Sequence, residues 1–234
     1  VDCVVATLET AVGNEPTFFD EKMKRLGDVI YVEDDDLKRL KKLNIRVVSL
    51  ANNHFFDLGY DGATHTIELL DQIGVMHCGA GKNLEEASKP AVVMHAGETY
   101  AFLGFCDWRE EHVGWCPFAT ESTPGVNPMF DDYVVSEVSK YAKTYDHVIV
   151  LPHWGKEYLL WPKPEIVKIS KKMLNAGAEL IFGSHSHCVQ PICQKTNKAV
   201  AYSMGNFLFP DRLITKPRST YYPHPSLDIS SLPQ

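Results

Sequence analysis

Residue types that can bind a metal ion or transfer a proton recur in short polar segments, each of which follows an apolar, strand-like run. The segment "GSHSHCVQP" (183–191) places His185 and His187 one residue apart, directly behind the run 179–182. The other segments are "TLET" (7–10) with Glu9, "ANNHFFD" (51–57) with Asn53, His54 and Asp57, "PHWGKEY" (152–158) with His153, and "SMGNF" (203–207). In parallel α/β sheets, functional groups collect just beyond the carboxyl ends of the strands. We therefore expect one carboxylate, several amides and four histidines to converge on one sheet edge.

Each of these residues alone has an ordinary explanation. A histidine after a strand is most often a surface or hydrogen-bonded residue, and adjacent asparagines suit a turn because asparagine tolerates the left-handed conformation. An H-x-H pair at a strand end is a stronger signal, because residues i and i+2 point the same way along a strand. The joint occurrence behind four successive strands favours one shared site over four independent explanations.

Imidazoles, one carboxylate and one amide oxygen form a mixed nitrogen and oxygen ligand set. Such a set favours Zn, Mn, Fe or Ni over Ca or Mg. A carboxylate can bridge two divalent ions about 3.5–4 Å apart, an arrangement common in phosphoester hydrolysis. A histidine beside such ions that does not bind them is a natural proton donor. His54 is the candidate, and Asp57, three residues on, is the partner expected to orient its ring.

The chain as a whole alternates between strand and helix patterns. The strand-like runs are 3–7, 46–50, 75–78, 91–95, 100–106, 147–152, 179–183 and 199–203, and the helical stretches are 34–43, 62–74, 131–144 and 164–176. This alternation predicts an α/β fold with mainly parallel strands. The runs 91–95 and 100–106, separated by "AGET", predict a hairpin inserted into that pattern.

Composition limits the classes of function. The chain has 234 residues, enough for a substantial core, and its net charge of −7 argues against nucleic-acid binding, which needs a basic face. No apolar run approaches the ~18 residues of a membrane span. The six cysteines include no C-x-x-C pair, which argues against a zinc knuckle.

The domain organisation is predicted to be simple. We expect residues 1–209 to form one domain and residues 210–234, with five of the 14 prolines, to form an extended tail. The chain opens without an initiating Met on a strand-like stretch, so we expect a fragment or processed form whose domain is incomplete at its N-terminus.

Six motifs stand in order along the chain. They are "TLE" (7–9), "NNHFFDLG" (52–59), "GAGKN" (79–83), "HWGKEY" (153–158), "GSHSHCVQP" (183–191) and "YSMGNF" (202–207). In this order they resemble the motifs of the capsule-synthesis family typified by CapA and PgsA of poly-γ-glutamate production. That family belongs to the calcineurin-like metallophosphatase superfamily, and the resemblance covers residues 2 to 209.

The resemblance implies an α/β fold, the four-layer α-β-β-α sandwich of the metallophosphatases, with a pair of divalent ions. It also implies a role for each site residue: Glu9 as the bridging carboxylate, Asn53, His153 and His185 as ligands of one ion, His187 as a ligand of the other, and His54 as the acid beside the leaving group.

Two features depart from the family pattern. The first superfamily motif is an aspartate near the end of an earlier strand. It would precede Val1, so we expect the fold to lack its first strand and the second ion to lack one ligand. Asp2 is a poor substitute, because it opens the strand that leads to Glu9. Thr7 stands where the family has asparagine, and its hydroxyl can still donate a hydrogen bond.

These observations lead to three hypotheses of function. The first is a metal-dependent hydrolase of phosphoesterase type, associated with capsule or poly-γ-glutamate synthesis and acting on a small-molecule or polymeric anionic substrate. The second is a non-catalytic component of capsule or poly-γ-glutamate assembly or export. The third is a metal-dependent hydrolase of γ-glutamyl amide bonds. The resemblance further implies capsule or poly-γ-glutamate synthase subunits as partners and an extracytoplasmic, membrane-associated setting.

Several residues are weaker candidates. Core packing is favoured over pocket lining for Trp154 and Tyr158, and Glu157 is a candidate hydrogen-bond partner of a metal ligand. Asn206 is a candidate for the edge of the site. Residues 106–128 suggest either an irregular surface loop or a loop that covers the site.

Overall fold

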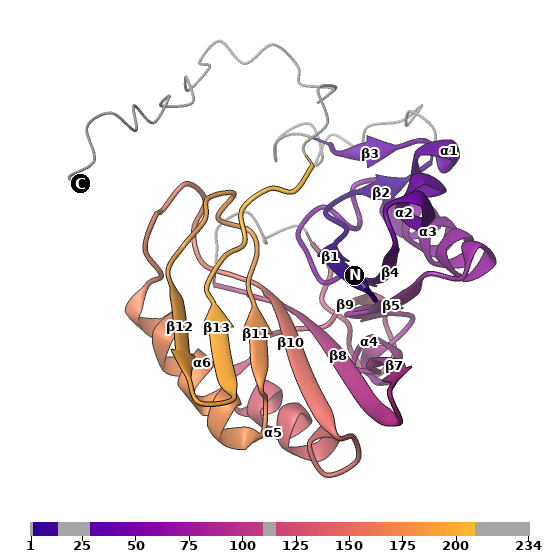
Figure 1. Ribbon diagram of the computed structural model, residues 1–234. Helices are drawn as coiled ribbons and strands as arrows, with labels where there is room; N and C mark the ends of the chain where they lie inside the picture. The colour runs from indigo at the N-terminus through magenta and orange to yellow at the C-terminus, as the bar shows by residue number, and fades with distance from the viewer. Residues whose placement is uncertain (1, 14–28, 110–115, 209–234) are drawn as a thin grey trace, which may run out of the picture.

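The computed structural model describes residues 2–13, 29–109 and 116–208, which fold into four layers of helix, sheet, sheet and helix (Figure 1). The first sheet has the order β1-β4-β5 and is parallel throughout. Its strands are β1 (Val4–Thr7), β4 (Ile45–Ser49) and β5 (Met76–Cys78). The outer face of this sheet packs against α3 (Gly59–Ile73), with the short helices α1 (Asp34–Leu37) and α2 (Arg39–Lys42) beside it.

The second sheet has six strands in the order β12-β13-β11-β10-β8-β7. The strands are β7 (Ala91–His95), β8 (Glu98–Cys106), β10 (His147–His153), β11 (Leu180–Phe182), β12 (Ile192–Lys195) and β13 (Lys198–Ala201). The four inner strands run parallel, and the two edge strands β7 and β12 run antiparallel to their neighbours. Helices α5 (Asp131–Tyr141) and α6 (Pro164–Ala176) cover its outer face.

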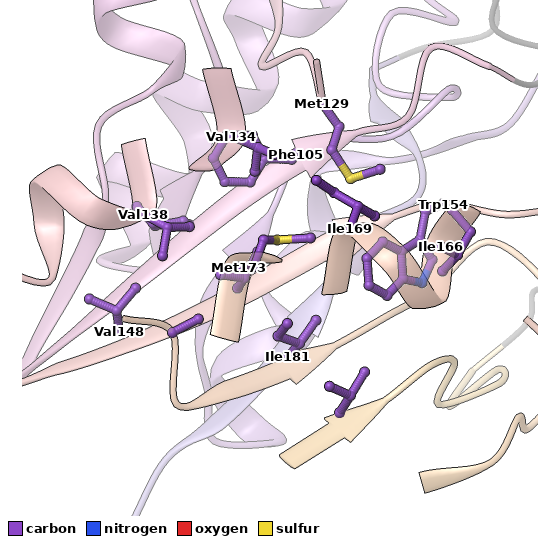
Figure 2. Close-up of a cluster of buried hydrophobic side chains, with 14 of the residues drawn as sticks. Phe105, Met129, Val134, Val138, Val148, Trp154, Ile166, Ile169, Met173 and Ile181 are labelled. Carbon is purple, nitrogen blue, oxygen red and sulfur yellow. The ribbon is translucent and has the colours of Figure 1, made fainter. Parts of the chain in front are cut away.

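Three hydrophobic clusters fill the three spaces between these layers. Val47 and Cys78 of the first sheet meet Phe102 and Ile149 of the second, which makes the central layer of the sandwich. The cluster between the six-stranded sheet and helices α5 and α6 is shown in Figure 2. The third cluster lies between the first sheet and α3. The two sheets therefore share one interface, and each has its own helical cover.

The inner strands are apolar at nearly every position because both of their faces are buried. Along β8, Leu103 and Phe105 pack toward α5 and α6, whereas Phe102 packs toward the other sheet. The helix α6 buries Ile166, Ile169 and Met173, a spacing of three to four residues that defines one helix face.

The α/β sandwich is confirmed, and each predicted strand matches an observed one with small differences at the ends. The antiparallel pairing of β7 with β8 confirms the hairpin. The predicted helix 34–43 is divided at Lys38, whose ψ of −19° is that of a tighter turn. The elements that the sequence patterns did not predict are short: β2 (Ala11–Val12), β3 (Tyr31–Val32), β6 (Ala80–Gly81), β9 (Gly125–Val126), the edge strand β12 and α4 (Leu84–Ala87).

Within the described ranges, no helix combines the length and the apolar character that crossing a membrane requires. All six cysteines lie in these ranges and are free thiols, three of them buried. The tail predicted for residues 210–234 lies outside the described residues.

His147, at the start of β10, is bound between two carboxylates at the end of the sheet opposite the polar segments. Its Nδ1 lies 2.8 Å from Glu179 and its Nε2 lies 3.1 Å from Glu98. The hydrogen bonds to Glu179 and then to Glu98 raise the pKa of His147. The protonated ring therefore favours the folded state. This contribution is complete below the unfolded pKa of about 6.5 and is lost as the pH rises through the raised folded value.

Replacing His147 by glutamine is expected to destabilise the protein more at pH 5.5 than at pH 9. The difference between the two losses should be about 0.5–1 kcal/mol, the usual size for a partly exposed ion pair. Urea unfolding of wild type and His147→Gln at both pH values measures it. An equal loss at the two pH values would show that the charge of His147 contributes nothing.

Candidate metal centre

The polar segments meet at the carboxyl edges of the two sheets. Glu9 follows β1, Asn53 and His54 follow β4, His153 is the last residue of β10, and His185 and His187 follow β11. Ligand atoms of Glu9, His153 and His185 all lie within 4.8 Å of one another, so these three side chains form a group that could hold a metal ion. Residues from both sheets contribute to it, which places the group at the mouth of the space between them.

Glu9 lies at the centre of this arrangement. Its Oε1 is buried and makes no hydrogen bond with any described residue. That oxygen is 3.5 Å from Nε2 of His153 and 3.7 Å from Nε2 of His187. Burial raises the pKa of Glu9, opposed in part by the charges of His187 and His54. A buried carboxylate oxygen that faces two imidazole nitrogens without a hydrogen bond fits a divalent ion.

Asn53 and His153 face each other from opposite sheets. The Oδ1 of Asn53 is 2.6 Å from Nε2 of His153, and both side chains are buried. Burial holds the pKa of His153 well below its ordinary value, and the neighbouring rings of His185 and His187 act in the same direction. These effects favour the neutral form of His153, which is the form that binds a metal.

The backbone that carries His185 and His187 differs from the expectation of an H-x-H pair projecting along a strand. The strand β11 ends at Phe182, and both histidines have left-handed backbone angles, with φ of 88° and 56°. The ring centroids of His185 and His153 are 4.6 Å apart, and those of His185 and His187 are 6.4 Å apart. Positive φ at residues other than glycine is uncommon and is concentrated at functional sites.

Gly183 allows the loop with His185 and His187 to leave the sheet. The indole nitrogen of Trp154 donates a hydrogen bond to the carbonyl oxygen of Tyr202 at 2.8 Å. A Cβ on Gly183 would overlap both of these atoms. Only a residue without a side chain therefore fits at this point.

The variant Gly183→Ala is expected to lower the free energy of unfolding by about 2–3 kcal/mol, because the overlap with Tyr202 and Trp154 displaces packed groups. Chemical denaturation measures this loss. Gly97→Ala is the matched control, since it adds a Cβ in open space at a positive φ and should cost about 1 kcal/mol. Equal losses in the two variants would contradict the role assigned to Gly183.

His54 and Asp57 form the pair that the spacing predicted. The Nδ1 of His54 is 2.7 Å from Oδ2 of Asp57, and that oxygen also accepts a hydrogen bond from the backbone of Ile30 at 2.6 Å. Burial lowers the pKa of His54, but the hydrogen bond and charge of Asp57, together with the charge of Glu9, outweigh it and the net shift is upward. His54 is thereby favoured as a protonated group beside Glu9.

The weaker candidates lie in different environments, one in the core and the others around the site. Trp154 is buried in the core, whereas Tyr158 is 61% exposed and its ring centroid is 5.9 Å from that of His187, so core packing was the wrong expectation for Tyr158. The Oδ1 of Asn206 lies 2.9 Å from Nδ1 of His187 and accepts its hydrogen bond, which places Asn206 at the edge of the site. Glu157 is near enough for its charge to raise the pKa of both Glu9 and His54.

The segment 106–128 contains β9, and its residues 110–115, including His112, lie outside the described residues. Arg109 is bound by Asp107 at 2.8 Å and by Asp131, so the observed partners of its guanidinium are these carboxylates. A role for this segment as a cover over the site stays a prediction.

Sequence reasoning missed two residues that shape the site. The amide of Asn52 donates to the carbonyl oxygen of Leu8 at 2.8 Å, and its Oδ1 accepts from the backbone of His54 at 3.0 Å. Asn52 thus joins the loop after β4 to the loop that carries Glu9. Ser184, the second residue, contacts His153.

The fold and the site together define a four-layer α/β sandwich with a candidate metal centre at the carboxyl edges of its two sheets. Among solved structures, a putative 5'-nucleotidase from Staphylococcus aureus in complex with α-ketoglutarate has this fold. It aligns with a TM-score of 0.51 and 13% identity, covering 74% of this chain and 34% of that chain.

The chain belongs to the family of bacterial capsule synthesis proteins, PGA_cap, whose sequence model matches residues 1–211. It is 30% identical to the PGA biosynthesis protein CapA of Bacillus subtilis, over 89% of this chain and 55% of that protein. It is 32% identical to the capsule biosynthesis protein CapA of Bacillus anthracis, over 76% of this chain and 43% of that protein. The family resemblance predicted from the six motifs is confirmed, and the chain spans about half the length of these relatives.

Proposed function

We propose that this chain is a metal-dependent hydrolase of phosphoesterase type that serves capsule or poly-γ-glutamate synthesis. The observation that carries the proposal is the group of Glu9, His153 and His185, with ligand atoms within 4.8 Å of one another. Beside it lies a histidine whose hydrogen-bonded partner is a buried carboxylate. A ligand set with a separate proton donor beside it is the arrangement of a hydrolytic metal site. A purely structural metal site needs no proton donor.

In this proposal, the site residues divide between two divalent ions. Asn53, His153 and His185 would hold one ion, His187 would bind the other, and Glu9 would supply the carboxylate of the site. The mixture of imidazole, carboxylate and amide oxygen favours Zn, Mn, Fe or Ni. When bound, such ions supply Lewis-acid polarisation of a phosphoryl group and activate water for attack.

His54 is the residue we assign to proton delivery. Asp57 binds its Nδ1 and stabilises the protonated ring. Proton delivery then falls to Nε2, which would protonate the departing oxygen of the ester. Because Asp57 is itself fully buried and held by the backbone of Ile30, the ring has a fixed orientation before substrate arrives.

A non-catalytic role in poly-γ-glutamate assembly is the second candidate. It is favoured by the description of another relative, 29% identical over 88% of this chain, as a probable polyglutamine synthesis accessory protein of Mycobacterium tuberculosis. Hydrolysis of γ-glutamyl amides is a third possibility, because water activation at the same ions suits amide bonds as well as esters.

Metal content and activity distinguish these candidates. We expect elemental analysis of the purified protein to find about two ions per chain, and the double variant His185→Ala, His187→Ala to lose them. The metal-loaded protein should hydrolyse phosphoesters faster than it hydrolyses poly-γ-glutamate. Faster cleavage of γ-glutamyl bonds would support the third candidate. A metal-free protein that binds poly-γ-glutamate and hydrolyses neither substrate would favour the second.

A further inference from the structure

Asn52 lies in the loop after β4 and is fully buried, so it can act on a bound group only through other residues. Its Nδ2 donates to the carbonyl oxygen of Leu8 at 2.8 Å, and its Oδ1 accepts from the backbone N–H of His54 at 3.0 Å. Its own N–H donates to the carbonyl oxygen of Leu50 at 2.9 Å, and its carbonyl oxygen accepts from the thiol of Cys116 at 3.4 Å. Each polar atom of Asn52 therefore has a partner.

These contacts explain why an asparagine stands at position 52. The φ of Asn52 is not positive, so tolerance of the left-handed conformation is not the reason. A carbonyl oxygen needs a donor and a backbone N–H needs an acceptor, and an amide side chain provides both. An ionised aspartate has no proton to donate, and the hydroxyl of serine stands where asparagine has Cγ, one bond short of Nδ2. The side chain, not the backbone conformation, therefore requires asparagine.

The two peptide groups that Asn52 binds belong to three residues of the candidate site. The carbonyl of Leu8 lies in the peptide group that leads to Glu9, and the N–H of His54 lies in the peptide group that joins Asn53 to His54. A peptide group is planar and moves as a unit, so holding one of its atoms orients the residue that follows. One amide side chain thus links the backbone of the buried carboxylate to the backbone shared by the amide ligand and the proton donor.

We propose that Asn52 is a positioning residue that sets Glu9 against Asn53 and His54. The hydrogen bond to Leu8 positions the carboxylate of Glu9, and the hydrogen bond from the N–H of His54 positions the proton donor. The roles of Glu9, Asn53 and His54 rest on the proposed function. Because the two hydrogen bonds use different atoms of Asn52, a substitution can remove one of them and keep the other.

Metal affinity tests the hydrogen bond to Leu8, by calorimetric titration with Mn²⁺ and with Zn²⁺ in the absence of substrate. Asn52→Ala should lower the affinity about 10-fold, the lower end of the effect of losing a residue that supports metal ligands. Asn52→Ser should lower it by a similar factor, because serine is too short to reach Leu8. Wild-type affinity in either variant would overturn the inference.

Hydrolysis tests the hydrogen bond to His54, with the metal ion at a saturating concentration. Serine keeps an oxygen that can accept from the N–H two residues further on, whereas alanine does not. Asn52→Ala should therefore lower kcat for β-glycerophosphate about 10-fold more than kcat for p-nitrophenyl phosphate, whose leaving group needs no proton. Asn52→Ser should lower both rates alike. Equal losses for the two esters in Asn52→Ala would overturn the role assigned to this hydrogen bond.

The two kinds of failure are distinguishable, because metal affinity is measured without substrate. A protein that binds the metal ion more weakly in both Asn52 variants but hydrolyses neither ester would contradict the proposed function and support the positioning of Glu9. A protein that hydrolyses esters and keeps its wild-type affinity in these variants would contradict only the inference.

The matched control is Asn127→Ala. Asn127 is also buried, its Nδ2 donates to the carbonyl oxygen of Gly104 at 2.9 Å, and its Oδ1 accepts from the hydroxyl of Tyr133 at 2.9 Å. Both alanine variants should lower the midpoint of urea unfolding by similar amounts, since each removes a buried amide with a donor and an acceptor partner. Asn127→Ala should keep the wild-type metal affinity and the wild-type ratio of the two rates. The same loss of affinity in both variants would show a general effect of lost stability and would overturn the role of Asn52.

Discussion

Replacing Glu9 by glutamine is expected to remove metal binding and, at the same time, to stabilise the metal-free fold. The buried Oε1 of Glu9 has no hydrogen bond among the described residues, and burial raises the pKa of Glu9. The carboxylate is therefore unfavourable in the absence of a cation. Glutamine keeps the shape and removes the charge, so the free energy of unfolding of the metal-free protein should rise by about 1 kcal/mol.

The affinity for Mn²⁺ or Zn²⁺ should fall at least about 100-fold in Glu9→Gln, because a neutral amide replaces the anionic ligand at the centre of the site. At a free ion concentration 100 times the wild-type Kd, the ion should stabilise wild type by about 2.7 kcal/mol and the variant by little. Denaturation with and without the ion measures both effects. The control Glu165→Gln changes an exposed carboxylate in the first turn of α6 and should change neither. Metal-dependent stabilisation that persists in Glu9→Gln would remove Glu9 from the ligand set.

The layered fold could be predicted because its strands are long apolar runs buried on both faces. β8 and β10 pair in parallel over seven residues. Such unbroken apolar runs do not have the periodicity of an amphipathic helix, so the sequence predicts strands there. The two-residue strands β2, β3, β6 and β9 could not be predicted, because two residues have no periodicity. The sequence also does not predict the break in the helix 34–43, since its charges suit a single helix as well as two short ones.

The candidate site was predictable to the extent that position along a strand determines it. Glu9, His153 and His185 stand at or just beyond the carboxyl ends of strands, so their meeting is a consequence of topology. The interval from His54 to Asp57 is local, and the predicted pair is observed at 2.7 Å. The hydroxyl of Thr7 donates a hydrogen bond to the hydroxyl of Ser184, 177 residues away, and this contact depends on how the two sheets face each other. No local pattern carries that information.

Replacing His54 by glutamine is expected to slow hydrolysis most for esters with poor leaving groups. If His54 protonates the departing oxygen, its loss should lower kcat for β-glycerophosphate about 100–1000-fold. The p-nitrophenolate ion leaves without a proton, so kcat for p-nitrophenyl phosphate should fall less than about 10-fold. The metal content should stay at the wild-type value, because His54 is assigned to proton transfer and its Nδ1 binds Asp57.

A matched control separates this role from general damage to a histidine–aspartate pair. Nε2 of His65 in α3 lies 2.8 Å from Asp34 of α1, where both side chains are partly exposed, and His65→Gln should leave both rates unchanged. Asp57→Asn should act in the same direction as His54→Gln, since it weakens the hold on the protonated ring and keeps the side-chain volume. Equal losses for the two esters in His54→Gln would show that His54 binds the phosphoryl group instead of protonating the leaving oxygen. Only the difference between the esters assigns the proton, because binding of the shared phosphoryl group affects both substrates alike.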